Sequence, residues 1–204
     1  MEEYSTLNPS AMPENKQIRH AARERLSGNW LYAVLCTLLF YAVTSVAGSI
    51  PLAGLLVVCP LAFGFSIAFL HLVRSEVEGD DLVTKPFSAF HQYGRMLGAS
   101  LLVLVLTFLW SLLLIIPGIV KAYSYALTPY LVHDHPEMSE YDCLKRSQQL
   151  MKGYKWKLFL LDLSFIGWIL LGFITFGIGL LWVRPYMETA HAEFYERRKA
   201  LETA

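Results

Sequence analysis

The sequence predicts an all-α fold, a polytopic membrane helical bundle of about six spans arranged as three hairpins, each preceded by a short amphipathic interfacial helix. Composition is the first reason: hydrophobic residues make up 55% of the 204 residues and charged residues 17%, whereas about a quarter of a soluble domain is charged. Charge distribution is the second, because the stretches 31–70, 96–120 and 163–183 contain no Asp, Glu, Lys or Arg. A helix needs about 20 such residues to cross a bilayer.

Turn signals divide these stretches into shorter spans. Ser49 to Pro51 and Thr175 to Gly179 contain no charge, and Pro117-Gly118 has the residue types of a sharp turn. Each turn is therefore predicted to join two antiparallel helices. The expected spans cover residues 31–48, 52–73, 96–116, 119–132, 156–174 and 180–194.

Three short amphipathic segments precede the hairpins. In residues 14–27, Ile18, Ala22 and Leu26 recur at helical spacing among arginines, which predicts a helix lying on the lipid headgroups. Residues 86–93 and 138–151 have the same character, and Ser139 suits an N-cap.

The three hairpins resemble one another in sequence. A glycine beside an aromatic or basic residue begins each hairpin, and a proline follows in its second span. The pairs are Gly28 with Pro60, Gly94 with Pro129, and Gly153 with Pro185. Such long-period similarity indicates an internal repeat. We expect a mobile tail over 1–13, one membrane domain over 14–196 with possible repeats at 14–74, 84–133 and 138–196, and a C-terminal tail over 197–204.

The basic residues predict the orientation in the membrane. Of the 17 Lys and Arg residues, Lys121 and Arg184 lie within spans, and the remaining fifteen (17 − 2) fall on one side of the predicted topology. Because positive residues collect on the cytoplasmic side, both termini are predicted to face the cytoplasm. The net charge of zero gives no basic field for nucleic acid.

Charged residues within the predicted spans form the candidate site. Asp162 lies in an apolar stretch, where an ionised group costs roughly 2.5–3.5 kcal/mol. Arg184, Glu188 and His191 share one helix face that antiparallel packing would bring toward Asp162, and Lys121 lies in another span. The functional interpretation is a proton or ion relay, or a lipid headgroup held by Arg184. The structural interpretation is an ion-paired network that fixes the register of the helices.

Aromatic and basic residues at span edges are interpreted as membrane-interface anchors, because cations meet anionic headgroups there and aromatic rings favour the interface. These residues are Trp30, Lys152, Tyr154, Lys155, Trp156 and Lys157. His133, Asp134 and His135 offer groups that a metal ion could use, but neighbours in sequence seldom ligate one ion together, so we expect no metal site and no cofactor.

Several motifs carry a family resemblance. LLLIIPGIVKAYSYALTPYLVHDHPEMS, the later LSFIGWILL and FGIGLLWVRPY, and a terminal A-x-A-E-F-Y resemble the bacterial integral membrane proteins known as domain of unknown function 975. The resemblance covers residues 16–196 and implies a multi-span protein of the cytoplasmic membrane without an established activity. It extends distantly to the membrane domains of some glycerophosphodiester phosphodiesterases, and supplies no functional residues.

The function expected is that of a non-enzymatic membrane protein that binds lipid, a membrane-protein partner or a second copy of itself, as a scaffold or accessory subunit. The alternative is a small transporter or channel that uses the intramembrane charges. Sequence patterns of common nucleotide-binding and hydrolase sites are absent.

Overall fold

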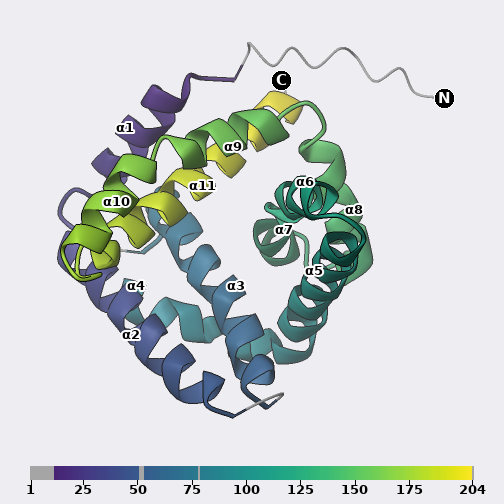
Figure 1. The fold of residues 1–204 in the computed structure, drawn as a ribbon, viewed down its shortest axis with the longest axis horizontal. Coiled ribbons are helices and arrows are strands. Elements are labelled where there is room, and N and C mark those ends of the chain that lie inside the picture. Colours follow the sequence, from purple (N-terminus) through teal and green to yellow (C-terminus); the bar gives the residue numbers. More distant parts are fainter. Residues whose placement is uncertain (1–11, 51–52, 78, 204) are drawn as a thin grey trace.

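The computed structural model describes residues 12–50, 53–77 and 79–203, and the ordered elements of these residues are all helices (Figure 1). The predicted all-helical class is therefore confirmed. In chain order the elements are α1 (Asn15–Leu26), α2 (Trp30–Gly48), α3 (Ala53–Val73), α4 (Asp81–Thr84), the 3-10 helix η2 (Lys85–Gln92), α5 (Tyr93–Leu113), α6 (Ile115–Tyr125), α7 (Thr128–Asp134), α8 (Glu140–Leu150), α9 (Lys155–Leu163), α10 (Ile166–Ile174) and α11 (Leu180–Thr203).

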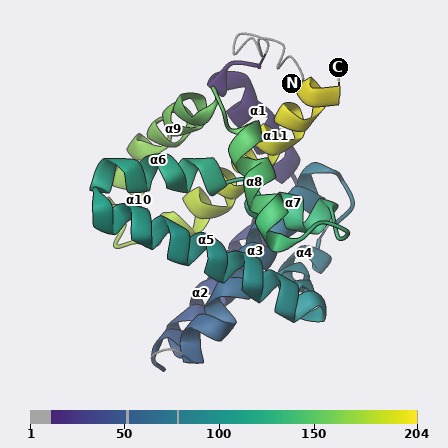
Figure 2. The ribbon, with the colours of Figure 1, turned by 90° about the vertical axis from the view of Figure 1, so that its right-hand side faces the viewer.

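The longer helices pair as neighbours along the chain. Helix α2 packs beside α3, α5 beside α6, and α9 with α10 beside α11 (Figures 1 and 2). Among the described residues, four helical stretches are long and apolar enough to cross a membrane: Trp30–Gly48, Gly54–Val73, Asp81–Leu112 and Lys155–Ile174. The arrangement of six spans in three hairpins stays a prediction.

Helix α3 forms the centre of the molecule. It packs against α2, η2, α5, α7 and α11, and 72% of its apolar window is buried, against 17% for α2. Small and aromatic residues such as Ala68 and Phe69 are fully covered. Elements from both halves of the chain therefore pack on α3, and its position is set by the packing of these neighbours.

The second predicted turn lies earlier than expected. The chain breaks at Leu114, which has an extended backbone (φ −161°, ψ 140°), and Pro117 with Gly118 belongs to the first turns of α6. Proline is tolerated there because the first N–H groups of a helix have no intrahelical acceptor. Gly118 lets α6 approach α5 closely, since a Cβ at this position would lie 2.2 Å from the Ser111 hydroxyl oxygen.

Two of the predicted spans are interrupted. The fourth consists of α6 and α7, with Pro129 in the first turn of α7, and the fifth consists of α9 and α10, separated at Ser164 and Phe165. Pro129 has no N–H for the ladder, so a new helix begins where a continuous one was expected.

The amphipathic helices turn their apolar faces inward. Ile18, Ala22 and Leu26 of α1 are completely buried, and α1 packs along α11. The apolar face of α1 is therefore covered by the protein itself, whereas the sequence predicts that it contacts lipid headgroups. Helix α8 has the predicted N-cap, because the Ser139 hydroxyl accepts a hydrogen bond from the backbone N–H of Asp142 at 3.2 Å.

Most of the predicted C-terminal tail belongs to α11, which continues as a helix through Thr203. Arg198 is only 1% exposed; its Nε donates to the Leu150 carbonyl at 2.8 Å, and its guanidinium lies over the Tyr154 ring. The last carbonyls of a helix lack intrahelical donors, so α8 offers this arginine a ready acceptor. At the N-terminal side, residues 1–11 of the predicted tail lie outside the described residues, while Met12 is buried in the core.

Large apolar side chains cover the outer surfaces of the paired helices. On α5 and α6, Phe108, Leu112, Ile115 and Ile116 are each more than 60% exposed. Similar rows follow α2 and α10. Apolar surface of this extent is typical of a membrane or protein contact and untypical of a surface facing water.

Candidate functional site

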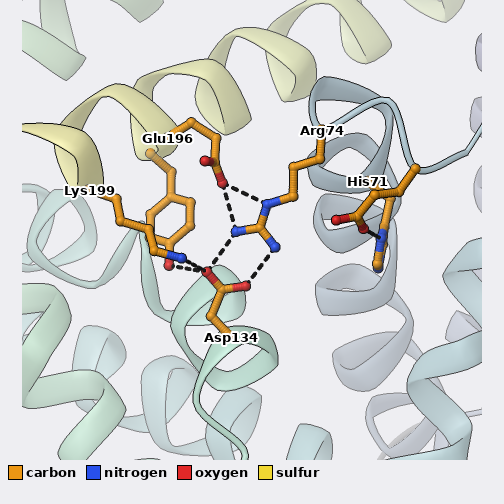
Figure 3. A network of polar contacts seen from close by, with 7 residues as sticks. His71, Arg74, Asp134, Glu196 and Lys199 are labelled. Atoms are coloured by element: carbon orange, nitrogen blue, oxygen red, sulfur yellow. Dashed lines mark hydrogen bonds and ion pairs between the residues drawn. The ribbon is translucent and has the colours of Figure 1, made fainter.

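Five side chains from three helix ends meet in one cluster, which we name the charged junction (Figure 3). Arg74 directly follows α3, and Asp134 is the last residue of α7. Tyr195, Glu196 and Lys199 project from one face of α11, where residues three and four apart are neighbours. The junction therefore ties together helices that are far apart in sequence.

Asp134 is the common acceptor of the charged junction. Its carboxylate receives two hydrogen bonds from the Arg74 guanidinium, at 2.8 and 2.7 Å. The Tyr195 hydroxyl donates to it at 2.8 Å and the Lys199 ammonium at 2.7 Å. Arg74 also donates through Nε to Glu196 at 2.8 Å. The paired N–H groups of arginine match the two oxygens of a carboxylate, which makes this contact strong and directional.

The electrostatics of the charged junction favour the ionised carboxylate. The Asp134 side chain is 6% exposed, and burial alone would raise its pKa. Hydrogen bonds from Arg74, Lys199 and Tyr195 outweigh the burial and hold the pKa of Asp134 well below its usual range. Asp134 is therefore charged at every physiological pH.

Two histidines adjoin the charged junction. The His71 ring is hydrogen-bonded through Nδ1 to Glu76 (Figure 3), and its centroid lies 4.7 Å from that of the His133 ring. Burial, followed by the proximity of His71, lowers the pKa of His133. No group of three His, Cys, Asp or Glu residues in the described ranges is placed to hold a metal ion.

Asp162, the centre of the predicted intramembrane network, contacts one of its proposed partners. His191 Nε2 lies 2.6 Å from the Asp162 carboxylate, and the Tyr123 hydroxyl donates to the same carboxylate at 2.9 Å. Tyr123 was not predicted. These contacts link α9 to α11 and α6, so Asp162 joins three helices.

The other predicted members of the network lie elsewhere. Arg184 pairs with Glu188 on the same helix at 2.8 Å, and Ser66 donates to Glu188 at 3.0 Å. The Lys121 ammonium lies over the Trp110 ring, 4.8 Å from its centroid. The residues proposed as one network therefore form three separate groups in the structure.

The predicted interface anchors differ in exposure. Trp156 is 67% exposed and stacks on Phe159, Lys152 is exposed, and Lys155 and Lys157 are half-buried. Tyr154 is 1% exposed beneath Arg198, so its ring is not available to headgroups. Trp30 is half-buried against Tyr186, with ring centroids 6.2 Å apart.

Three cavities accompany these groups. The largest, about 880 Å³, lies between α8 and the end of α11 beside Tyr195 and Lys199; Arg146 and Glu202 form an ion pair of 2.6 Å at its edge. The second, about 350 Å³, is lined by three tryptophans and is named here the aromatic cavity. The third, about 330 Å³, contains three histidines and is named the histidine cavity. Because acidic and basic residues both line the first cavity, it favours neither an anionic nor a cationic ligand. The second is mainly aromatic, and the third is rich in histidine.

The charged junction was not predicted, because each of its residues, taken by itself, is typical of a solvated residue after a helix. The proposed repeat contained the signal. Arg74, Asp134 and Glu196 each lie at or just beyond the end of a predicted repeat, so similar hairpins packed together would bring these positions to one place.

The fold and the charged junction define a class of protein: an all-helical chain with several apolar helices, tied together by an ion-paired cluster. The chain belongs to the family described as Protein of unknown function (DUF975), whose model matches residues 52–202. The predicted resemblance is thereby confirmed, although the match begins after α1 and α2. No curated protein and no solved structure matches the chain.

We predict that Asp134→Asn lowers the free energy of unfolding by about 3 kcal/mol, because Arg74 and Lys199 lose their shared buried carboxylate. Since the pKa of Asp134 is lower in the folded chain than in the unfolded one, the wild-type advantage is full at neutral pH and diminishes as the pH falls through about 4. Equilibrium unfolding in detergent at several pH values measures it. The exposed Glu137→Gln is the control and should leave stability close to that of the wild type. Equal stability of both variants would contradict a structural role for the junction.

We predict that Asp162 couples to His191 and not to Arg184. In double-mutant cycles of unfolding, Asp162→Asn with His191→Gln should give an interaction energy of about 1 kcal/mol, because the two side chains are in contact. Asp162→Asn with Arg184→Gln should be additive within about 0.5 kcal/mol. A larger coupling to Arg184 would show that Arg184 reaches Asp162 rather than Glu188.

Proposed function

We propose that this chain is a non-enzymatic, multi-pass protein of the bacterial cytoplasmic membrane that binds an anionic phospholipid in the aromatic cavity and acts as a lipid-binding scaffold or accessory subunit. The aromatic cavity is the observation that carries this proposal. The lining residues are Arg23, Trp30, Trp168, Trp182, Val183 and Tyr186. They contain three of the five tryptophans of the chain.

The walls of the aromatic cavity come from four helices and are held by contacts outside it. Tyr186 donates its hydroxyl to the Arg19 carbonyl of α1 at 3.0 Å and packs edge-on against Phe165, with centroids 4.9 Å apart. Arg19 in turn donates to the Ser164 carbonyl at 3.2 Å. The cavity is thus set by the packing of α1 on α11, and a ligand would find the aromatic wall ordered before it binds.

The charge of the aromatic cavity favours an anion. Arg23 is exposed and is the one charged residue of the lining, and it forms no ion pair within the described parts of the chain. A guanidinium binds phosphate through paired N–H groups, and a cation at a membrane surface attracts anionic lipid by roughly 1 kcal/mol.

The surroundings of the aromatic cavity favour a lipid over a soluble anion. Exposed apolar residues continue away from it on both sides, including Leu31 and Leu35 on α2 and Ile166 and Leu170 on α10. Tryptophan and tyrosine favour the boundary between headgroups and acyl chains. A phospholipid would place its phosphate at Arg23, its glycerol region among the rings and its acyl chains along the apolar rows.

The same lining supports a binding role over a catalytic one. Hydrolysis or transfer at a lipid headgroup uses a positioned acid, base or nucleophile. The carboxylates and histidines that the structure pairs, such as Asp162 with His191, belong to other contacts and do not line this cavity.

We predict that protein purified in mild detergent retains anionic phospholipid, as measured by native mass spectrometry. Trp168→Ala with Trp182→Ala should remove most of the bound lipid, because both indole walls are lost. Arg23→Gln should reduce the preference for phosphatidylglycerol over phosphatidylcholine about fivefold, equivalent to about 1 kcal/mol. The control Trp156→Ala alters an exposed tryptophan outside the cavity and should retain lipid as wild type does. Unchanged retention in the Trp168/Trp182 variant would contradict the proposal.

A transporter or channel is the second candidate, favoured by one observation. Asp162, His191 and Tyr123 form a half-buried titratable chain between α6, α9 and α11. Ion or proton flux in the same reconstituted membranes, lost in Asp162→Asn and unaffected by removal of the aromatic walls, would favour this candidate over the scaffold.

A further inference from the structure

The histidine cavity adjoins the charged junction without sharing a lining residue with it, and it is separate from the aromatic cavity. It lies between α3, η2, α5 and α7 and has a volume of about 330 Å³. The lining contains His71, Lys85, Ser88, His91, Gln92 and His133, with Ile67 and Met96 as the apolar remainder. Three of the six histidines of the chain are therefore gathered in one cavity, from three different elements.

From this lining we propose that the histidine cavity binds a phosphate group, carried either by a membrane lipid or by a small soluble molecule. The polar side chains supply an ammonium, a hydroxyl, an amide and three imidazoles, all of which can donate hydrogen bonds. Among the described residues, no carboxylate lines the cavity. Phosphate presents several acceptor oxygens in different directions, so donors from separate elements suit it better than they suit a planar anion.

Lys85 supplies the fixed charge of the histidine cavity. It is half-buried at the start of η2, and it makes no ion pair with any residue of the described ranges. An ammonium that is not paired with a carboxylate, surrounded by hydrogen-bond donors, suits an anion, because a bound phosphate would balance its charge.

The imidazoles of the cavity are held in place by their surroundings. Glu76 engages Nδ1 of His71, which leaves Nε2 as the ring nitrogen open to a further partner. His133 packs edge-on against His71, and the following residue is Asp134 of the charged junction. The rings are therefore positioned by the same helix ends that the junction joins.

The charge of the cavity argues against a divalent cation. Lys85 would repel it, and the three histidines do not form a group with metal-binding geometry in the described residues. The histidine cavity is therefore expected to bind phosphate and not zinc.

The test uses the full chain, purified in detergent without phosphate. Inorganic phosphate at millimolar concentration should raise the thermal unfolding temperature, and calorimetry should give a single site. Lys85→Gln should weaken phosphate binding at least fivefold, and His133→Gln should weaken it as well. The control Lys145→Gln removes an equal charge at a position outside the histidine cavity and should leave the affinity unchanged.

A second arm identifies the source of the phosphate group. Nanodiscs containing phosphatidic acid, whose headgroup is a phosphomonoester, are compared with nanodiscs of phosphatidylcholine. Binding of phosphatidic acid that depends on Lys85 assigns the site to a lipid headgroup, whereas binding of inorganic phosphate in detergent without binding of phosphatidic acid assigns it to a soluble phosphate. Absence of both, equal losses in Lys85→Gln and Lys145→Gln, or stabilisation by zinc in place of phosphate would overturn the proposal. If Lys85→Gln does not fold, the exposed His91→Gln provides the same comparison.

Discussion

The carboxylate of Asp134 holds together the ends of three helices. Arg74 approaches it from α3, Tyr195 and Lys199 from α11, and Asp134 itself ends α7. Ion pairs with little solvent around them are strong only if their geometry and their remaining hydrogen bonds are satisfied. Here every oxygen of Asp134 has a donor, and Arg74 has a second carboxylate in Glu196. This cluster fixes where the helical pairs meet, and the largest cavity and the histidine cavity adjoin it.

The charged junction joins the helices at one place, and elsewhere the outer surfaces of the paired helices are covered with apolar residues. The rest of the structure follows from these two features. Lipid provides no hydrophobic force between helices, so their association depends on packing and polar contacts. The central α3 supplies the packing, and the charged junction and the Asp162 contacts supply the polar bonds. In the proposed membrane arrangement, the apolar outer surfaces of α2, α5 and α10 contact lipid.

The sequence was sufficient for the helical class and for most helix positions, because the absence of charge over 31–70 and 96–120 leaves few alternatives to apolar helices. The sequence was insufficient where a residue type is common in two different structural contexts. Proline is common in turns but is equally well tolerated in the first turn of a helix, where Pro117 lies in α6. The predicted turn between α5 and α6 is therefore three residues later than the break at Leu114. Arg198 reads as a tail residue, and only the tertiary position of the α8 carboxyl end reveals why it is buried.

The candidate site was predictable in part. The contact of Asp162 with His191 follows from antiparallel pairing of neighbouring helices, which sequence order alone suggests. Arg184 instead pairs with Glu188, because residues four apart on one helix can satisfy each other without reaching the next helix. The aromatic and histidine cavities each combine at least three elements, and no local spacing encodes such a meeting.

The proposed topology places the charged junction on the cytoplasmic side of the bilayer and the turns of the hairpins on the opposite side. Labelling of single cysteines tests this arrangement directly. Single cysteines are introduced at Ser49, in the turn after α2, and at Glu137, near the junction, after the three native cysteines are replaced by alanine. A maleimide that cannot cross membranes should label Ser49→Cys in intact cells and Glu137→Cys only after permeabilisation. Labelling of Glu137→Cys in intact cells, or equal labelling of both positions there, would contradict the proposed arrangement.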